Sequence, residues 1–301
     1  MITRAPGKLV LSGAYSVLEG SPALVTAVDR YVVADSGRVA EWLTPEVTAA
    51  KLRCKPWFDA SALRMEDRKI GLGSSAAILV ASLAADLLES GEVTNGRQLA
   101  ESVVERAMVA HAVVQPLGSG IDVIASCFGG TLVTQRVQAS MSHAPVMLPE
   151  DVYFEVWSAP YAQSTHNMLA LLRSFQHSQP SLYSRLIAEQ AAAAEQTLHA
   201  LRTRQSALFV ASLARQESAL DALGCNATMP IVTEELRLLA TRAANESAAV
   251  LPAGAGGGDV AIFAGIQPPS PELCALMAQL NHARLDLSLS ALGVHAVNKE
   301  C

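Results

Sequence analysis

The chain of 301 residues lacks the features that mark secreted, membrane-spanning and metal-cluster proteins. Its five cysteines are widely spaced and include no CxxC pair, which is typical of thiols in a reducing compartment. No run of about 18 apolar residues offers a membrane span. The N-terminal Met1-Ile2-Thr3-Arg4-Ala5-Pro6 does not resemble a signal peptide. These absences predict a cytoplasmic protein with no membrane partner.

Charge is also sparse. Only 17% of the residues are charged, the formal net charge is −6, and Lys and Arg form no cluster. Because nucleic-acid-binding domains carry such a cluster, we expect no nucleic-acid partner. A phosphorylated small molecule remains compatible with this composition, since it needs only local positive charge. Half of the residues are hydrophobic, so a chain of this length can bury a sizeable core in one large domain or two ordinary ones.

The hydrophobic pattern predicts an α+β protein with a helix-rich second half. Helices are expected from Ala76 to Leu88, from Gln98 to Val114, and, as three or four helices interrupted near Pro180 and Pro230, from about 165 to 247. A further helix should begin near Pro271. Strands are expected at 9–11, 23–28 with an extension to 34, 131–133, 153–157, 260–263 and 294–296. The stretch from 37 to 69 shows no clear pattern.

Glycine is concentrated in three loops that lie far apart in the chain. They are preceded by a short Ala5-Pro6-Gly7-Lys8 element, and they read Gly71-Leu72-Gly73-Ser74-Ser75-Ala76-Ala77, Gly118-Ser119-Gly120-Ile121-Asp122 and Gly254-Ala255-Gly256-Gly257-Gly258-Asp259. Glycine allows positive φ and a close approach of the backbone to an anion. Successive N–H groups then form an anion-binding concavity, aided by a helix N-terminus. Together the loops indicate a nucleotide-dependent enzyme.

The loop from Gly71 to Ala77 gives the strongest single signal. The strand-like Lys69-Ile70 leads into it, and a helix begins at once. It has neither the G-x-x-x-x-G-K-[ST] spacing of a Walker A loop nor a third glycine in G-x-G-x-x-G, because Ala76 stands there. The phosphate interpretation uses the helix dipole and the free N–H groups. The plainer interpretation is a glycine turn followed by a serine N-cap.

These motifs together resemble the GHMP kinases, the family with members that phosphorylate galactose, homoserine, mevalonate or phosphomevalonate. Ala5 to Gly13 resembles the N-terminal motif, Gly71 to Ala77 the phosphate-binding loop, and Pro252 to Asp259 the C-terminal motif. The resemblance spans nearly the whole chain. It implies a two-domain GHMP kinase fold with the active site in the cleft between an N-terminal, ribosomal protein S5-like nucleotide-binding domain (1–155) and a helix-rich, ferredoxin-like C-terminal domain (156–301).

The details within the motifs are most like those of family members that act on phosphomevalonate. Gly13-Ala14-Tyr15-Ser16-Val17-Leu18 resembles their G-x-Y-x-V-L. Ala110 to Gln115, followed by Gly118 to Asp122, resembles A-H-x-x-A-Q and then G-S-G-x-D. The pair Ser164-Thr165 follows Trp157-Ser158-Ala159 as in W-x-G then S-T, with alanine where glycine is usual. His111 stands where mevalonate kinases have a metal-binding glutamate, which argues against that member.

The resemblance also implies roles for single residues. Asp122 would be the base for the acceptor, and Lys8 would neutralise charge near the transferred phosphoryl group and keep Asp122 ionised. The alternatives are a helix N-cap for Asp122 and a solvated surface lysine for Lys8. His111 is expected to be a packed helix residue rather than a ligand.

The implied cofactors are ATP and Mg²⁺. ATP would be bound by Gly71, Leu72, Gly73, Ser74, Ser75 and Ala76, with Ser75 as the Mg²⁺ ligand. Substrate would be bound by Tyr15, Ser119, Gly120, Ser164, Thr165, Gly256, Gly257 and Gly258. The alternatives are a core position for Tyr15, a helix cap for Ser164 and Thr165, and a plain β-turn for the last glycine loop.

The expected reaction is transfer of the γ-phosphoryl group of ATP to phosphomevalonate, which gives diphosphomevalonate and ADP. Two alternatives stay open. One is a GHMP kinase for another acceptor, such as mevalonate or a sugar. The other is a non-catalytic relative that binds a ligand or a protein, against which Lys8, Ser75 and Asp122 are all present together.

Overall fold

The structure is a computed structural model that describes residues 1–65, 68–93, 96–137, 140–159 and 165–297. The chain forms two compact units. Unit 1 comprises Met1–Leu9, Val25–Leu132 and Leu287–Cys301, and unit 2 comprises Val10–Leu24 and Val133–Asp286. This division is interleaved, and the C-terminal segment of unit 1 returns to pair with the first strand. The two domains expected at 1–155 and 156–301 stay a prediction.

Most strands of the N-terminal half belong to one six-stranded sheet. Its order is β12-β1-β2-β6-β7, and β3 pairs with β2. The strands are β1 (Ile2–Ser12), β2 (Ala23–Val39), β3 (Pro56–Asp59), β6 (Thr131–Val137), β7 (Ser140–Val146) and β12 (His295–Val297). β12 runs antiparallel to β1, with Ile2 opposite Val297 and Arg4 opposite His295.

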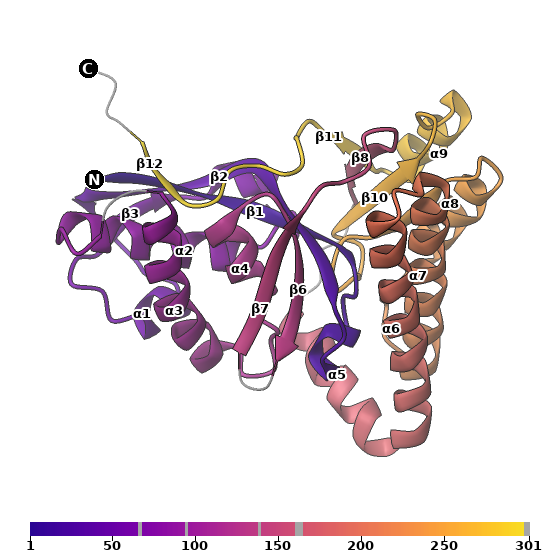
Figure 1. Cartoon of the computed structure of the whole chain (residues 1–301), viewed down its shortest axis with the longest axis horizontal. Helices are drawn as coiled ribbons and strands as arrows, with labels where there is room; N and C mark the ends of the chain where they lie inside the picture. Colours follow the sequence, from indigo (N-terminus) through magenta and orange to yellow (C-terminus); the bar gives the residue numbers. More distant parts are fainter. Residues whose placement is uncertain (66–67, 94–95, 138–139, 160–164, 298–301) are drawn as a thin grey trace. The chain divides into compact units, whose positions relative to one another are not determined.

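In the part of unit 1 that the structure describes, there are four α-helices. They are α1 (Pro45–Ala49), α2 (Ser74–Glu89), α3 (Arg97–Val114) and α4 (Ile121–Phe128). α2 is rich in Ala and Leu and is buried along almost its whole length, as expected for a helix that is apolar all round. α1, α3 and α4 all pack against it (Figure 1). Both helices expected between 76 and 114 are therefore confirmed. α4, which begins at the second glycine loop, was not predicted.

The segment before β12 is hydrogen-bonded to the rest of unit 1 through backbone N–H groups and a hydroxyl group. Ser288 N donates to Asp29 Oδ1 at 2.6 Å, and Ser290 N donates to Thr26 Oγ1 at 3.1 Å. The Ser290 hydroxyl lies 2.7 Å from that of Thr131. Residues from three separate stretches of the chain thus meet at one place, where Thr26 and Thr131 are buried and Ser288 and Ser290 are exposed.

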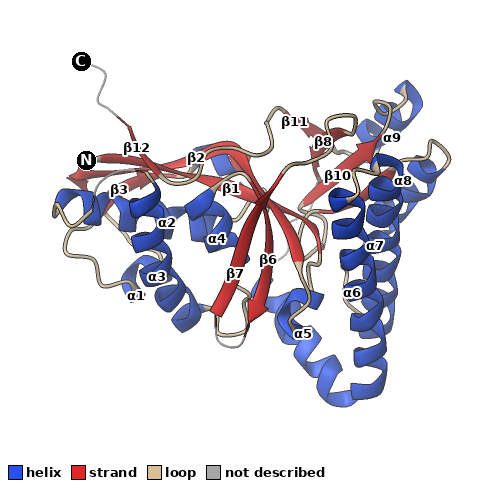
Figure 2. Ribbon diagram, viewed as in Figure 1, coloured by secondary structure: helices blue, strands red, loops and turns tan. Residues whose placement is uncertain are grey.

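Among its described residues, unit 2 contains a four-stranded antiparallel sheet and five α-helices, and Figure 2 shows the helices in blue and the strands in red. The sheet order is β11 (Ala283–Leu285), β8 (Tyr153–Ser158), β10 (Val260–Gly265) and β9 (Ala249–Pro252). β10 lies in the middle and is buried at every residue. The helices are α5 (Thr165–Ser178), α6 (Pro180–Arg202), α7 (Ser206–Ala227), α8 (Glu234–Ala244) and α9 (Pro271–Gln279).

The boundaries of the unit 2 helices follow from local sequence signals. Pro180 is the first residue of α6, where a missing N–H costs nothing. The side chains of Thr233 and Ser270 cap α8 and α9. The predicted run of three or four helices with breaks near Pro180 and Pro230 is confirmed. Short elements complete the chain: η1 (Ser16–Glu19), η2 (Ser61–Leu63), β4 (Arg64–Met65) and β5 (Arg68–Lys69).

Across the described ranges, no helix combines the length and the apolar character that crossing a bilayer requires. α6 and α7, the two longest described helices, pack side by side, and each buries both apolar and polar residues.

One buried polar residue of α7 has a strongly shifted pKa. Glu217 on α7 is 9% exposed, and burial together with the charge of Asp221 raises the pKa of its carboxyl group to about 7.

This shift predicts a pH-dependent stability. The pKa of Glu217 is higher in the folded chain than the 4.3 or so of an unfolded one, so folding favours the protonated carboxyl group. Its contribution is fully present below about pH 4.3 and is lost as the pH rises towards 7. Glu217→Gln should remove this loss, and its stability gain over the wild type should grow from pH 5 to pH 8, up to about 3 kcal/mol.

Urea unfolding of both proteins at the two pH values measures the effect. Glu189→Gln, an exposed position of α6, is the matched control and should show no such growth. An equal stability difference at pH 5 and pH 8 would contradict the prediction.

Candidate active site

The first glycine loop leads from β5 into α2 through two residues with positive φ. Gly71 has φ 73°, and Gly73, the N-cap of α2, has φ 77°. The described residues supply no side-chain cap to the first turn of α2. The predicted serine N-cap is therefore wrong, since the helix begins at Ser74 and its N-cap is Gly73. Uncapped N–H groups at a helix N-terminus are suited to bind an anion.

Lys8 lies directly across this loop. Its backbone N–H donates to the carbonyl oxygen of Leu72 at 2.9 Å. A Cβ atom built on Gly73 would lie 3.1 Å from both Cγ and Cε of Lys8. The aliphatic part of the lysine thus occupies the space that a side chain at Gly73 would need. The structure brings together Lys8 and the predicted phosphate loop, two features that are 65 positions apart in the sequence.

Asp122 lies in the first turn of α4, directly after the second glycine loop. The N-cap of α4 is Gly120, with φ 79°, so the interpretation of Asp122 as an N-cap does not hold. Its Oδ1 atom accepts from the N–H of Val123 at 3.0 Å, and its side chain is 24% exposed. A carboxylate in the first turn is stabilised by the helix dipole.

The loop before Asp122 and the helix after it are held by short contacts within unit 1. Ser119 Oγ accepts from the N–H of Ile121 at 3.4 Å, so this predicted substrate residue also stabilises the turn. Ser126 Oγ on α4 donates to the carbonyl oxygen of Pro6 at 2.8 Å. Because Pro6 is two residues before Lys8, α4 is attached to the same N-terminal motif that lies on the α2 loop.

Ser74 and Ser75 both lie in the first turn of α2. The Ser74 side chain is buried, whereas Ser75 is partly exposed. Among the described residues, no three His, Cys, Asp or Glu side chains are grouped to hold a metal ion. A hydroxyl oxygen, with phosphate and water oxygens, is nonetheless a suitable ligand set for Mg²⁺, which usually keeps several waters and binds few protein atoms. Ser75 remains the predicted ligand.

The third glycine loop connects β9 to β10 in unit 2. Gly256 has φ 79°, and a Cβ atom there would lie 2.3 Å from the carbonyl oxygen of Ile231. The N–H of Gly257 donates to that same carbonyl at 3.0 Å. Packing against Ile231 therefore requires glycine here, and the N–H of Gly257 is already used. Gly258 also has positive φ, at 89°. Substrate binding by these three glycines stays a prediction.

Tyr15 is hydrogen-bonded to this glycine loop. Its side chain is 2% exposed, and its hydroxyl donates to the carbonyl oxygen of Ala255. Burial raises the pKa of Tyr15 well above its usual range, so the hydroxyl stays protonated as a donor. Next to it, Gly13 N and the Ser12 hydroxyl donate to Gln216 Oε1 on α7. The described role of Tyr15 is thus to fix the glycine loop, and direct substrate binding by it stays a prediction.

Ser164 lies outside the described residues. Thr165 is the first residue of α5, but its side chain is not described. The strand that precedes them does reach the third glycine loop, because the N–H of Ala159 donates to the carbonyl oxygen of Asp259 at 3.0 Å. The end of β8 therefore lies beside this loop.

Two features of the site were not found from the sequence. One is the bond from Tyr15 to Ala255, which no local pattern signals. The other is the approach of His111 Nε2 to Asp122 Oδ1, at 3.6 Å. The sequence signals this approach only through the short separation between Ala110-His111 and Gly118-Ser119-Gly120.

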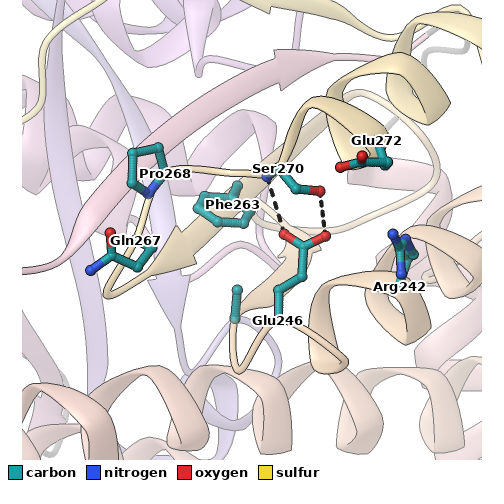
Figure 3. Close-up of a pocket in the computed structure, with 8 residues that line it drawn as sticks. Arg242, Glu246, Phe263, Gln267, Pro268, Ser270 and Glu272 are labelled. Atoms are coloured by element: carbon teal, nitrogen blue, oxygen red, sulfur yellow. Dashed lines mark hydrogen bonds between the residues drawn. The ribbon is translucent and has the colours of Figure 1, made fainter.

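A cavity of about 380 Å³ lies in unit 2, away from all of these residues. Arg242, Glu246, Phe263, Gln267 and Ser270 line it, with Ala248, Pro268 and Glu272. Figure 3 shows that the Glu246 carboxylate turns to Ser270, accepting from its N–H at 3.1 Å and from its hydroxyl. None of the predicted site residues lines this cavity.

Comparison with known proteins identifies the fold. No family model matches the chain, but its architecture is the two-domain fold of the GHMP kinases. Phosphomevalonate kinase of Streptomyces sp. (strain CL190) is 24% identical over an alignment of 339 residues that covers 87% of this chain and 89% of the relative. Mevalonate kinase of Archaeoglobus fulgidus is 32% identical over 161 residues, which cover 47% of this chain and 55% of the relative.

A solved structure supports the same assignment of the fold. Streptococcus pneumoniae phosphomevalonate kinase, in complex with phosphomevalonate and AMPPNP, superposes with a TM-score of 0.79 at 18% identity and covers 96% of this chain and 99% of its own. The predicted resemblance to GHMP kinases, and within them to phosphomevalonate kinase, is confirmed.

The Lys8–Gly73 contact predicts the effect of a side chain at position 73. Gly73→Val should abolish ATP binding, because valine resists positive φ and its side chain would displace Lys8 from the loop. Calorimetry with ATP measures the change. Gly91→Val is the matched control, since Gly91 has φ 72° with no neighbouring atom within 4 Å. It should lose stability but keep its ATP affinity. Wild-type ATP affinity in a folded Gly73→Val protein would refute the phosphate-loop interpretation.

Proposed function

We propose that this chain is an ATP-dependent kinase that transfers the γ-phosphoryl group of ATP to phosphomevalonate, giving diphosphomevalonate and ADP. The observation that carries the proposal is the position of Lys8 across an uncapped, glycine-led helix N-terminus. A cation beside N–H groups that can bind phosphate is what phosphoryl transfer needs, because the protein's main tasks are positioning and charge neutralisation. The acceptor is inferred from the full-length likeness to phosphomevalonate kinase.

In this proposal the N-terminal turn of α2 holds the phosphates of ATP, and Lys8 neutralises charge that develops on the transferred group. Ser75 would hold Mg²⁺, which supplies further charge neutralisation when it is bound. Asp122 orients the acceptor. The glycine loop from Gly254 to Asp259, fixed by Tyr15, is proposed to contact a phosphate of the acceptor or the γ-phosphate of ATP.

The role of Asp122 depends on the acceptor. An alcohol must lose a proton as it attacks, so Asp122 would act as a general base. A phosphate monoester has a second pKa near 6 and is already largely deprotonated at pH 7. Towards phosphomevalonate, Asp122 would therefore mainly orient the attacking group, and its loss should cost less than it would with an alcohol.

A mevalonate kinase activity is the second candidate. It is favoured by the 32% identity to the Archaeoglobus fulgidus enzyme, although that match covers 47% of this chain. The two candidates share ATP and the α2 loop, and they differ in whether the acceptor carries a phosphate. A non-catalytic, ligand-binding protein is the third alternative and predicts no turnover with any acceptor.

The acceptor can be identified by a coupled assay of ADP release with phosphomevalonate, mevalonate, homoserine and galactose. We expect the highest kcat/KM with phosphomevalonate. A clear preference for mevalonate would contradict phosphomevalonate as the acceptor, but the chain would still be a kinase. No turnover with any of the four, in a protein that binds ATP by calorimetry, would favour the non-catalytic alternative.

Substitutions at Lys8 and Asp122 test the chemistry. Asp122→Asn should lower kcat by roughly 10²- to 10⁴-fold with an alcohol acceptor, the range typical of general acid–base catalysis, and by less with phosphomevalonate. It should leave the ATP dissociation constant nearly unchanged, because backbone groups hold the nucleotide. Lys8→Met should lower kcat as well. Since the two act as a unit, the double variant should lose much less than the product of the single losses.

Lys55→Met is the control for lysine removal, since Lys55 is an exposed residue of the same unit, and it should keep wild-type kcat. Multiplicative losses in the double variant would mean that Lys8 and Asp122 act independently. Near-normal turnover of Asp122→Asn with every acceptor would remove Asp122 from the mechanism.

A further inference from the structure

His111 is a buried histidine with an unpartnered ring nitrogen. It lies in the last turn of α3 and is 3% exposed. Its Nε2 atom has no hydrogen-bond partner among the described residues, and it points to Asp122 Oδ1, 3.6 Å away. A buried polar atom without a partner costs about 1–3 kcal/mol. An imidazole placed this way therefore needs a reason, and the adjacent carboxylate offers one.

The glycine turn between these two residues packs tightly on α3. A Cβ atom on Gly118 would lie 2.9 Å from Cε1 of His111, and one on Gly120 would lie 2.5 Å from Cε of Met108. Met108 and His111 are three positions apart and so share one face of α3. Both outer glycines of Gly118-Ser119-Gly120 thus lie against this face, and the turn closes over the imidazole. The ring is confined to a position that faces Asp122.

The separation of 3.6 Å is longer than a hydrogen bond. Catalytic hydrogen bonds are often long before substrate binds and shorten in the reactive complex. Asp122 Oδ1 already accepts from the N–H of Val123, so a second donor at the same oxygen would fix the plane of the carboxylate. Only the tautomer with a proton on Nε2 can donate, because the other tautomer would present a lone pair to a negative oxygen.

We propose that His111 is a positioning residue for Asp122: the N–H of Nε2 is directed at Oδ1 and holds the carboxylate in the orientation that meets the acceptor. The inference rests on the proposed function in that Asp122 must contact the acceptor. His111 itself does not contact substrate. It acts through Asp122, from the interior side of the turn.

The first experiment needs no turnover and reads the tautomer directly. Nitrogen-15 NMR of the histidine rings at one fixed pH reports which nitrogen of His111 carries a proton. We expect the proton on Nε2, and a changed Nε2 resonance in Asp122→Ala. A proton on Nδ1 alone, or a His111 spectrum that Asp122→Ala leaves unchanged, overturns the proposal. This result stands even if no acceptor is ever turned over, so it separates the proposal from the proposed function.

The second experiment uses two amides as matched replacements. The amide nitrogen of His111→Gln can reach the place of Nε2, whereas that of His111→Asn is closer to the place of Nδ1. His111→Asn should lower kcat by roughly 10- to 100-fold, since a misplacement of about 1 Å at a catalytic group can cost this much, while KM for ATP stays within about twofold. His111→Gln should recover most of the loss. A purely structural role would instead lower the melting temperature of both variants and give no rescue of kcat.

The third arm tests whether His111 acts through Asp122. In an Asp122→Asn background, adding His111→Asn should change kcat by less than about threefold, because the group to be positioned has been neutralised. A full 10- to 100-fold further loss in that background overturns the proposal, as does equal kcat for His111→Asn and the wild type.

Discussion

The other parts of the candidate site in unit 1 depend on one contact, in which the aliphatic side chain of Lys8 packs against Gly73. Gly73 must adopt positive φ to start α2, and the stem of Lys8 fills the space on its Cβ side. At the preceding residue of the same strand, a Cβ atom on Gly7 would lie 2.9 Å from the carbonyl oxygen of Leu72. β1 and the loop are thus in contact at two successive residues. α4 is joined to the same strand through the bond from Ser126 to Pro6, so the turn that carries Asp122 is anchored as well.

Long, strongly patterned elements could be predicted from the sequence. α2, α3 and the central strand β10 have continuous apolar character or clear helical periodicity, and all three are found close to their expected ranges. Elements without such a pattern were missed. β7 is exposed at nearly every residue and shows no alternation. β9 has four residues and α4 eight, too few to establish a period.

The site could be predicted in part. Glycine and serine loops reveal backbone geometry, so a helix directly after the first glycine loop and the turns before Asp122 and Asp259 were visible in the sequence, although the helix begins at Ser74 and not at Ala76. Which side chain fills the space beside each glycine was not, because the contact of Gly118 with His111 and that of Gly256 with Ile231 depend on tertiary packing. For the same reason, the hydroxyl of Tyr15 could not be assigned to the carbonyl of Ala255 before the structure was known.

The pairing of β12 with β1 has a consequence for how the chain is made. The strand partners at residues 2–4 and 295–297 are about 290 positions apart in the sequence. When the ribosome has delivered α2, α3 and α4, the edge of β1 still lacks its neighbour, and Thr26 and Asp29 lack their bonds to Ser290 and Ser288. Pairings of such long sequence separation form slowly. The glycine loop from Gly71 to Ala77 is therefore synthesised well before the unit that carries it can close, and the edge of β1 stays unpaired until residues 295–297 emerge.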